Sequence, residues 1–270
     1  MKKYFILMLI TCKCLMPNSF DNIIDAADYE TYEAYENIEY SNIPKKPTIF
    51  DYINHQNQLS DIIERINKYL DNNGDINAVN KNGNTLLMEA VSIGYYDLAD
   101  YLVDKNADIS ITNANGENAL ILSSHYPYIM NLLINNNADI NIADNNGKTA
   151  LHYACEYGDL YSVKLLIKNG ADINKRDILG KTILMYAVEN EHLLLIKYLV
   201  EDLKVDINEK DDWGQNAMFY ATKIDTARYL IYNDMNYTDV NSIGLKPYEV
   251  MKYNGYINVS NYLQKLEKRR

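Results

Sequence analysis

The sequence predicts an all-α solenoid of stacked helix–turn–helix units with short turn or hairpin tips, because three patterns recur with one period. Turn glycines, each with Asn or Asp three residues before it, recur at intervals of 33, 31, 33, 34 and 30 residues; they are Gly83, Gly116, Gly147, Gly180, Gly214 and Gly244. An Asp-Ile pair followed by Asn or Ser begins eight residues before each of the first five glycines. An apolar triplet keeps the same register at residues 101–103, 132–134, 165–167, 198–200 and 229–231. Three independent patterns with one period indicate internal repetition.

Each unit is expected to run from a turn through two short helices. The Asn or Asp side chain of the turn can bond nearby backbone, and the glycine accepts a positive φ. Thr or Asn two residues after the glycine is expected to cap the first helix, as in residues 149–157. Gly158 separates this helix from the second, residues 160–168, and Gly74, Gly170 or an Ala in their place is expected to end the second helix. Such a pair cannot bury its apolar face alone, so neighbouring units must stack.

The motif of the third unit carries a family resemblance. The string from Gly147 to Ala154, GKTALHYA, with its period of 33 residues, is similar to the ankyrin repeat. The resemblance implies a solenoid that binds another protein, and a structural hydrogen bond for His152. The other units depart from the motif: its Pro appears only as Pro247, and two units are shortened near residues 125–127 and 222–224.

The repeats predict the organisation of most of the chain. We number them repeat 1 (78–110), repeat 2 (111–141), repeat 3 (142–174), repeat 4 (175–208) and repeat 5 (209–238), between a first cap (48–77) and a last cap (239–268). Residues 20–47 are predicted to be an acidic linker, since residues 21–47 hold seven acids and two lysines.

Residues 1–19 have the pattern of a secretory signal peptide. Lys2 and Lys3 precede an apolar run far shorter than the ~20 residues that span a bilayer. Residues 9–12, Leu-Ile-Thr-Cys, are similar to a bacterial lipobox with Cys12 as the lipid acceptor, although Thr11 departs from the usual small residue. Cleavage without lipidation is one alternative, and a buried N-terminal helix or strand is another. We therefore expect an exported protein, periplasmic, envelope-anchored or secreted, whose only membrane contact is a lipid on Cys12.

Composition and motifs argue against catalysis and against nucleic-acid binding. The 270 residues contain 26 Lys+Arg and 37 Asp+Glu, a formal net charge of −11 that gives no general attraction to nucleic acid. All 11 glycines have places in the repeats, so none remains for a phosphate-binding loop. His192 is assigned to a turn, His55 and His125 are isolated, and Cys155 is interpreted as a small core residue. No metal-ligand spacing is present, so we expect no cofactor, no metal and no enzymatic activity.

The predicted binding surface is the concave face together with the turn tips. The later tips carry the residues Ile178, Leu179, Asp212, Trp213 and Ile243, whereas the first three tip pairs are polar. Apolar groups at exposed turns favour a protein interface centred on repeats 4 and 5; the alternative is that they fold back on neighbouring turns. Tyr153, Tyr186 and Tyr220 share one column, either as an aromatic ladder on the concave face or packed between units. The remaining candidates are Ser92, Ile93, Glu156, Tyr157, Glu189 and Asn190.

Together these observations predict a non-catalytic, monomeric protein that binds a protein partner of unknown identity. The alternative is an accessory or protective factor for a periplasmic enzyme. A hydrolase would need catalytic groups outside the repeats, where the acidic linker has no His or Cys.

Overall fold

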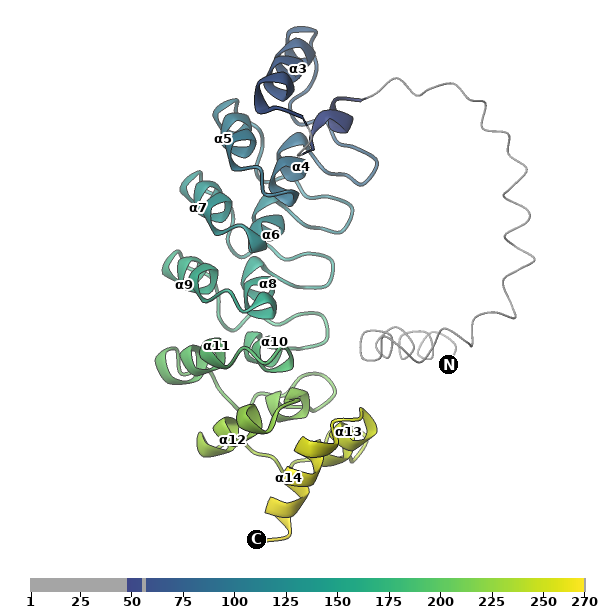
Figure 1. Ribbon diagram of the computed structural model, residues 1–270, viewed down its shortest axis with the longest axis vertical. Coiled ribbons are helices and arrows are strands. Elements are labelled where there is room, and N and C mark those ends of the chain that lie inside the picture. The colour runs from purple at the N-terminus through teal and green to yellow at the C-terminus, as the bar shows by residue number, and fades with distance from the viewer. Residues whose placement is uncertain (1–47, 55–56, 270) are drawn as a thin grey trace, which may run out of the picture. The chain divides into compact units, whose positions relative to one another are not determined.

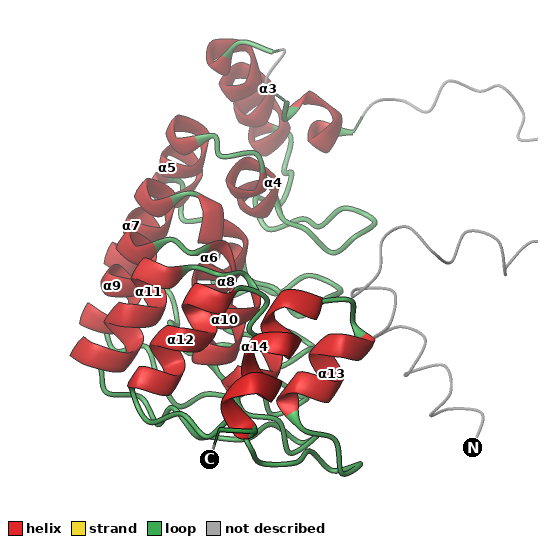
Figure 2. Cartoon of the chain, turned by 60° about the horizontal axis from the view of Figure 1, so that its bottom comes forward, coloured by secondary structure: helices red, strands yellow, loops and turns green. Residues whose placement is uncertain are grey.

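The computed structural model describes residues 48–54 and 57–269. Within these ranges all regular structure is helical, apart from one isolated bridge between Val79 and Thr85 (Figure 2). The predicted all-α repeat solenoid is therefore confirmed. The predicted signal peptide, Cys12 and the acidic linker lie outside the described residues.

The units contribute their helices to two parallel rows. In chain order the helices are η1 (Ile49–Tyr52), α3 (Leu59–Asp71), α4 (Leu86–Ser92), α5 (Tyr96–Asp104), α6 (Ala119–Leu122), η2 (Ser123–His125), α7 (Pro127–Asn135), α8 (Ala150–Tyr157), α9 (Leu160–Lys168), α10 (Ile183–Glu189), α11 (Leu193–Lys197), η3 (Tyr198–Asp202), η4 (Ala217–Tyr220), α12 (Ile224–Tyr232), α13 (Pro247–Tyr253) and α14 (Ile257–Glu267). In Figure 1 the helices α5, α7, α9, α11 and α12 form an outer row, and α4, α6, α8 and α10 form an inner row beside the projecting loops. The turn tips therefore lie on the side of the inner helices.

One side-chain geometry shapes every tip. The side-chain oxygen of Asp144 accepts hydrogen bonds from the backbone N–H groups of Asn146 and Lys148, both at 2.8 Å. The same pair of bonds, to the residues two and four positions later, is made by Asn80, Asn113, Asp177, Asp211 and Asn241. The turns predicted from the Asn/Asp-x-x-Gly pattern are therefore present in all six places.

The first helices start at the residues that the sequence indicates. Thr85 accepts from the N–H of Met88 at 3.2 Å, and Asn118 accepts from the N–H of Ile121 at 2.9 Å. In repeat 3 Thr149 precedes α8, and α9 has the bounds predicted for the second helix. Helix caps act within a few residues, so their positions can be predicted from local sequence.

The second helices end at a residue in the left-handed region, and this residue is not the one predicted in every unit. Gly170 does end its helix in the left-handed region, at φ 93°. The expectation that Ala takes this role elsewhere is wrong, because Asn holds the left-handed position in three units: Asn73, Asn106 and Asn137. Asn tolerates this conformation because its short amide can bond locally. Gly74 is needed for a different reason, since a Cβ there would lie 2.5 Å from the ring of Tyr69.

The core runs without interruption through the stacked units. The central residue of each apolar triplet is a fully buried leucine: Leu102, Leu133, Leu166, Leu199 and Leu230. Burial of a leucine side chain contributes about 1.5–3 kcal/mol, so each repeat gains stability from its place in this column.

Repeats 4 and 5 depart from the regular geometry. Repeat 4 has one extra residue, and the π-helix η3 accommodates it. Repeat 5 is shortened, and its first helix is the 3-10 helix η4. Glu191, at φ 60°, stands where other units place a left-handed glycine, and its carboxylate accepts from the N–H groups of Thr222 (2.5 Å) and Lys223 (2.7 Å). A side chain of repeat 4 thus holds the two residues that lead into α12 of repeat 5.

Candidate functional site

The six turn tips are linked into one continuous strip by backbone hydrogen bonds. In each bond, the N–H of the first tip residue donates to the carbonyl of the second tip residue in the preceding unit. The pairs are Ala114 to Asn82 (3.1 Å), Asn145 to Asn115 (2.9 Å), Ile178 to Asn146 (2.9 Å), Asp212 to Leu179 (3.0 Å) and Ser242 to Trp213 (2.8 Å). These bonds hold the tip side chains in register along the solenoid.

The last three tips expose large apolar side chains. Ile178 is 62% exposed, Trp213 is 46% exposed and Ile243 is 72% exposed. They do not fold back into the stack, whereas Leu179 is half-buried. Asp212 is exposed beside Trp213. We call Ile178, Trp213 and Ile243 the apolar tips.

The tyrosine column is packed between units. Each hydroxyl donates to the aspartate of its own turn: Tyr153 to Asp144 (2.7 Å), Tyr186 to Asp177 (2.6 Å) and Tyr220 to Asp211. Burial, together with the neighbouring aspartate, raises the pKa of all three hydroxyls. Tyr186 is only 7% exposed, so its prediction as a contact residue is wrong. In repeat 3, the ammonium of Lys148 lies 4.6 Å from its ring centre, and the ring centre of His152 lies 5.7 Å from it.

Two lysines lie between the rings of this column. The ammonium of Lys148 is 4.1 Å from the ring centre of Tyr153 and 4.6 Å from that of Tyr186. Lys181 is 4.6 Å from the ring centre of Tyr186 and 4.4 Å from that of Tyr220. Each cation thus bridges two repeats through the electron-rich faces of the rings.

The glutamates predicted as contact residues are the anionic partners of these lysines. Glu156 pairs with Lys148, and Glu189 pairs with Lys181 at 2.6 Å. Both carboxylates keep about a third of their side-chain surface exposed, so they line the face beside the tips as well as neutralising the lysines. Asn190 is exposed next to Glu189. In repeat 1, Ser92 is exposed and Ile93 is half-buried at the equivalent place.

The structure adds an aromatic contact that sequence reasoning missed. The ring of His125 lies 3.6 Å from that of Tyr157, centre to centre, and Tyr157 is 41% exposed. The ring centre of Tyr153 lies 6.3 Å from that of Tyr157. The shortening of repeat 2 brings His125 to the end of η2, next to repeat 3. Only the stacking of the two units makes this histidine part of a cluster.

The other histidines and the cysteine have structural positions. His152 is buried, and its Nδ1 accepts from the Thr149 N–H at 3.1 Å, as the resemblance implied. Burial lowers the pKa of His152 to about 4. His192 Nε2 is 2.8 Å from the carbonyl of Glu156 in the preceding repeat. Burial raises the pKa of Cys155, which has the environment of an inert core thiol.

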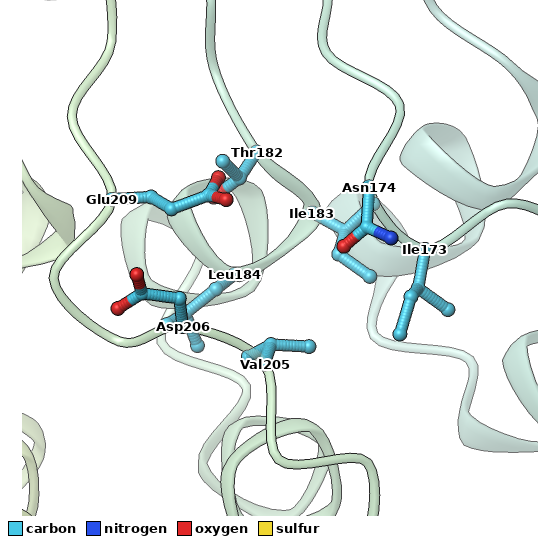
Figure 3. Close-up of a pocket in the computed structure, with 8 residues that line it drawn as sticks. All are labelled: Ile173, Asn174, Thr182, Ile183, Leu184, Val205, Asp206 and Glu209. Atoms are coloured by element: carbon cyan, nitrogen blue, oxygen red, sulfur yellow. The ribbon is translucent and has the colours of Figure 1, made fainter.

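Two hollows of the described region differ in size and openness. The recess in Figure 3, lined by Ile173, Leu184 and Val205 among others, has a volume of about 10 Å³, comparable with one water molecule. A wider, open hollow of about 310 Å³ lies between α11 and α12 on the outer row. Among the described residues, no three His, Cys, Asp or Glu side chains are grouped to hold a metal ion. Nor does any helix in residues 48–54 and 57–269 combine the length and hydropathy of a membrane span.

Comparison with known proteins identifies the repeat. A family model described as "Ankyrin repeats (3 copies)" matches residues 55–144, 105–177 and 163–243. These matches together cover more than two thirds of the chain. A search of curated proteins found no match.

Proposed function

The chain belongs to the ankyrin-repeat family, and we propose that it is a non-catalytic module that binds one protein partner through its apolar tips and the adjoining concave face. Ankyrin repeats are generally protein–protein interaction modules. The observation that carries the proposal is the exposure of Ile178, Trp213 and Ile243 on consecutive tips. Large apolar side chains gathered on a rigid exposed strip favour a buried interface, and tryptophan is enriched at the centres of such interfaces.

The surroundings of the apolar tips support this assignment. The backbone bonds between tips present the three side chains on a fixed frame, so little conformational entropy is lost on binding. Asp212, exposed beside Trp213, and the partly exposed Glu189 supply polar groups from the repeats that carry the apolar tips. An apolar centre with a polar rim is the usual composition of a protein interface.

The test is a triple substitution of the apolar tips: Ile178→Ser, Trp213→Ser and Ile243→Ser. A matched control replaces three residues that are at least as exposed on the outer helices: Tyr128→Ser, Leu194→Ser and Tyr232→Ser. We expect capture of one stoichiometric partner from extracts of the source cells to be lost with the tip variant and kept with the control. Because all six side chains are exposed, thermal unfolding should change little in either variant. Capture by the tip variant at wild-type levels would refute this surface.

We also propose that the protein is an exported monomer. This rests on the signal-like residues 1–19 and on Cys12 within a lipobox-like string. The intact mass of the chain recovered from an envelope fraction measures both the cleavage site and any lipid on Cys12. A full-length, unmodified mass in the soluble intracellular fraction would contradict export.

A further inference from the structure

Repeat 2 carries a negative charge at the position where repeats 3 and 4 have Lys148 and Lys181. Lys148 and Lys181 each follow a turn glycine directly, and their partners Glu156 and Glu189 stand eight residues later. In repeat 2 the same two positions are held by Glu117 and His125. Repeats 3 and 4 therefore place an ammonium group beside the tyrosine column, whereas repeat 2 places a carboxylate there.

The carboxylate of Glu117 has neutral partners only. It accepts from the side-chain amides of Asn113 at 2.8 Å and Asn115 at 3.3 Å. Within residues 57–269, Glu117 takes part in no ion pair, unlike Glu156 and Glu189 in the next two repeats. A half-buried carboxylate without a cation is an acceptor for one.

Aromatic rings adjoin this carboxylate. Glu117 holds the position of Lys148 and Lys181, whose ammonium groups lie 4.6 Å and 4.4 Å from the column tyrosine of the following repeat. For Glu117 that tyrosine is Tyr153, so the register of the repeats places the carboxylate beside its ring. The ring centre of Tyr157 lies 3.6 Å from that of His125 and 6.3 Å from that of Tyr153, and Tyr157 stays 41% exposed. An exposed electron-rich ring next to a carboxylate is suited to a cation from outside the chain.

We propose that Glu117, Tyr157 and His125 form a docking site for the guanidinium group of an arginine side chain on the protein partner. The planar guanidinium can lie against a ring and pair with a carboxylate at once, which an ammonium does less well. Charge complementarity supports a cationic partner, because residues 48–269 contain 30 acidic and 20 basic side chains. The inference rests on the proposed function, since it describes the chemistry of the same partner at repeats 2 and 3.

The probe is N-acetyl-arginine amide, titrated into the labelled full chain while the ring signals of Tyr157 and His125 are followed by NMR. We expect both signals to shift, and the neutral isostere N-acetyl-citrulline amide to leave them in place. The variant Glu117→Gln, which keeps the size of the side chain, should weaken the association by about two- to fivefold, the usual range for an exposed ion pair. Glu64→Gln is the matched control, because it removes the same charge from an exposed position on α3.

A second variant tests the site from the opposite direction. The double substitution Glu117→Lys and His125→Glu installs the Lys–Glu pair of repeats 3 and 4, so the chain would fill the place with its own cation. We expect the arginine-induced shift of Tyr157 to disappear although the variant stays folded. Equal shifts with the citrulline compound, equal weakening by Glu64→Gln, or an undiminished shift in the double variant would each overturn the proposal. The titration needs no partner, so its failure counts against this inference alone, whereas capture by the tip variant counts against the proposed function.

Discussion

The stacking of the tips can be tested by comparing two glycines in the same turn position. Gly147 and Gly244 both lie in the left-handed region, at φ 75° and 82°. A Cβ at Gly147 would come 2.8 Å from the backbone nitrogen of Ile178 in the next tip, whereas a Cβ at Gly244, in the last tip, would meet nothing within 4 Å. Replacing each by alanine therefore imposes the same local strain, and only Gly147→Ala also pushes two tips apart.

The expected magnitudes follow from these contacts. A left-handed alanine costs about 1–2 kcal/mol, partly offset by about 0.4–1 kcal/mol from the stiffer unfolded chain. Gly244→Ala should therefore lower the free energy of unfolding by about 1 kcal/mol. In Gly147→Ala the hydrogen bond from Ile178 N–H to the Asn146 carbonyl, 2.9 Å in the wild type, is also lost. That loss adds about 0.5–1.5 kcal/mol, for a total of about 1.5–2.5 kcal/mol.

Thermal unfolding followed by circular dichroism measures both variants against the wild type. The difference of about 0.5–1.5 kcal/mol between them corresponds to a difference in Tm of about 1–6 °C for a domain of this size. Equal destabilisation of the two variants would show that the neighbouring tip does not constrain Gly147. The reasoning that the tips form one rigid strip would then be refuted.

Two further predictions concern the contacts between and within units. Glu191→Gln should lower stability by about 1 kcal/mol and speed amide hydrogen exchange at Thr222 and Lys223, because hydrogen bonds to a charged acceptor are stronger than those to a neutral one. Unchanged exchange would argue against the contact between the two repeats. His152 has its pKa lowered from 6.5 to about 4 by burial, so between these values the unfolded chain binds a proton that the folded chain does not. The free energy of unfolding should therefore fall by up to about 3 kcal/mol as pH falls from 6.5 to 4. His152→Met introduces the residue that repeat 4 has at the same position, Met185, and should flatten the dependence of urea unfolding on pH in this range. An equally steep pH dependence in the variant would contradict the assignment.

The local parts of the fold were predictable from sequence because their interactions span few residues. The turn bonds of Asp144 reach two and four residues ahead, and Thr149 caps the helix that directly follows it. The exposed state of Ile178 and Trp213 was also expected, since these side chains occupy the tips of turns. The error over Ala at the helix ends arose because Asn can also adopt the left-handed conformation, as Asn106 and Asn137 do.

By itself, the sequence determined the repeat period, the turns, the caps and the apolar tips, all of which depend on residues close together in the chain. Only the tertiary structure decided that Tyr186 is covered, that Lys148 lies between Tyr153 and Tyr186, and that His125 meets Tyr157. These contacts join residues of different repeats, about one period apart. Whether a side chain in such a column faces solvent or a neighbour depends on how closely two units stack, and that distance is set by the packing of both helices against the shared core.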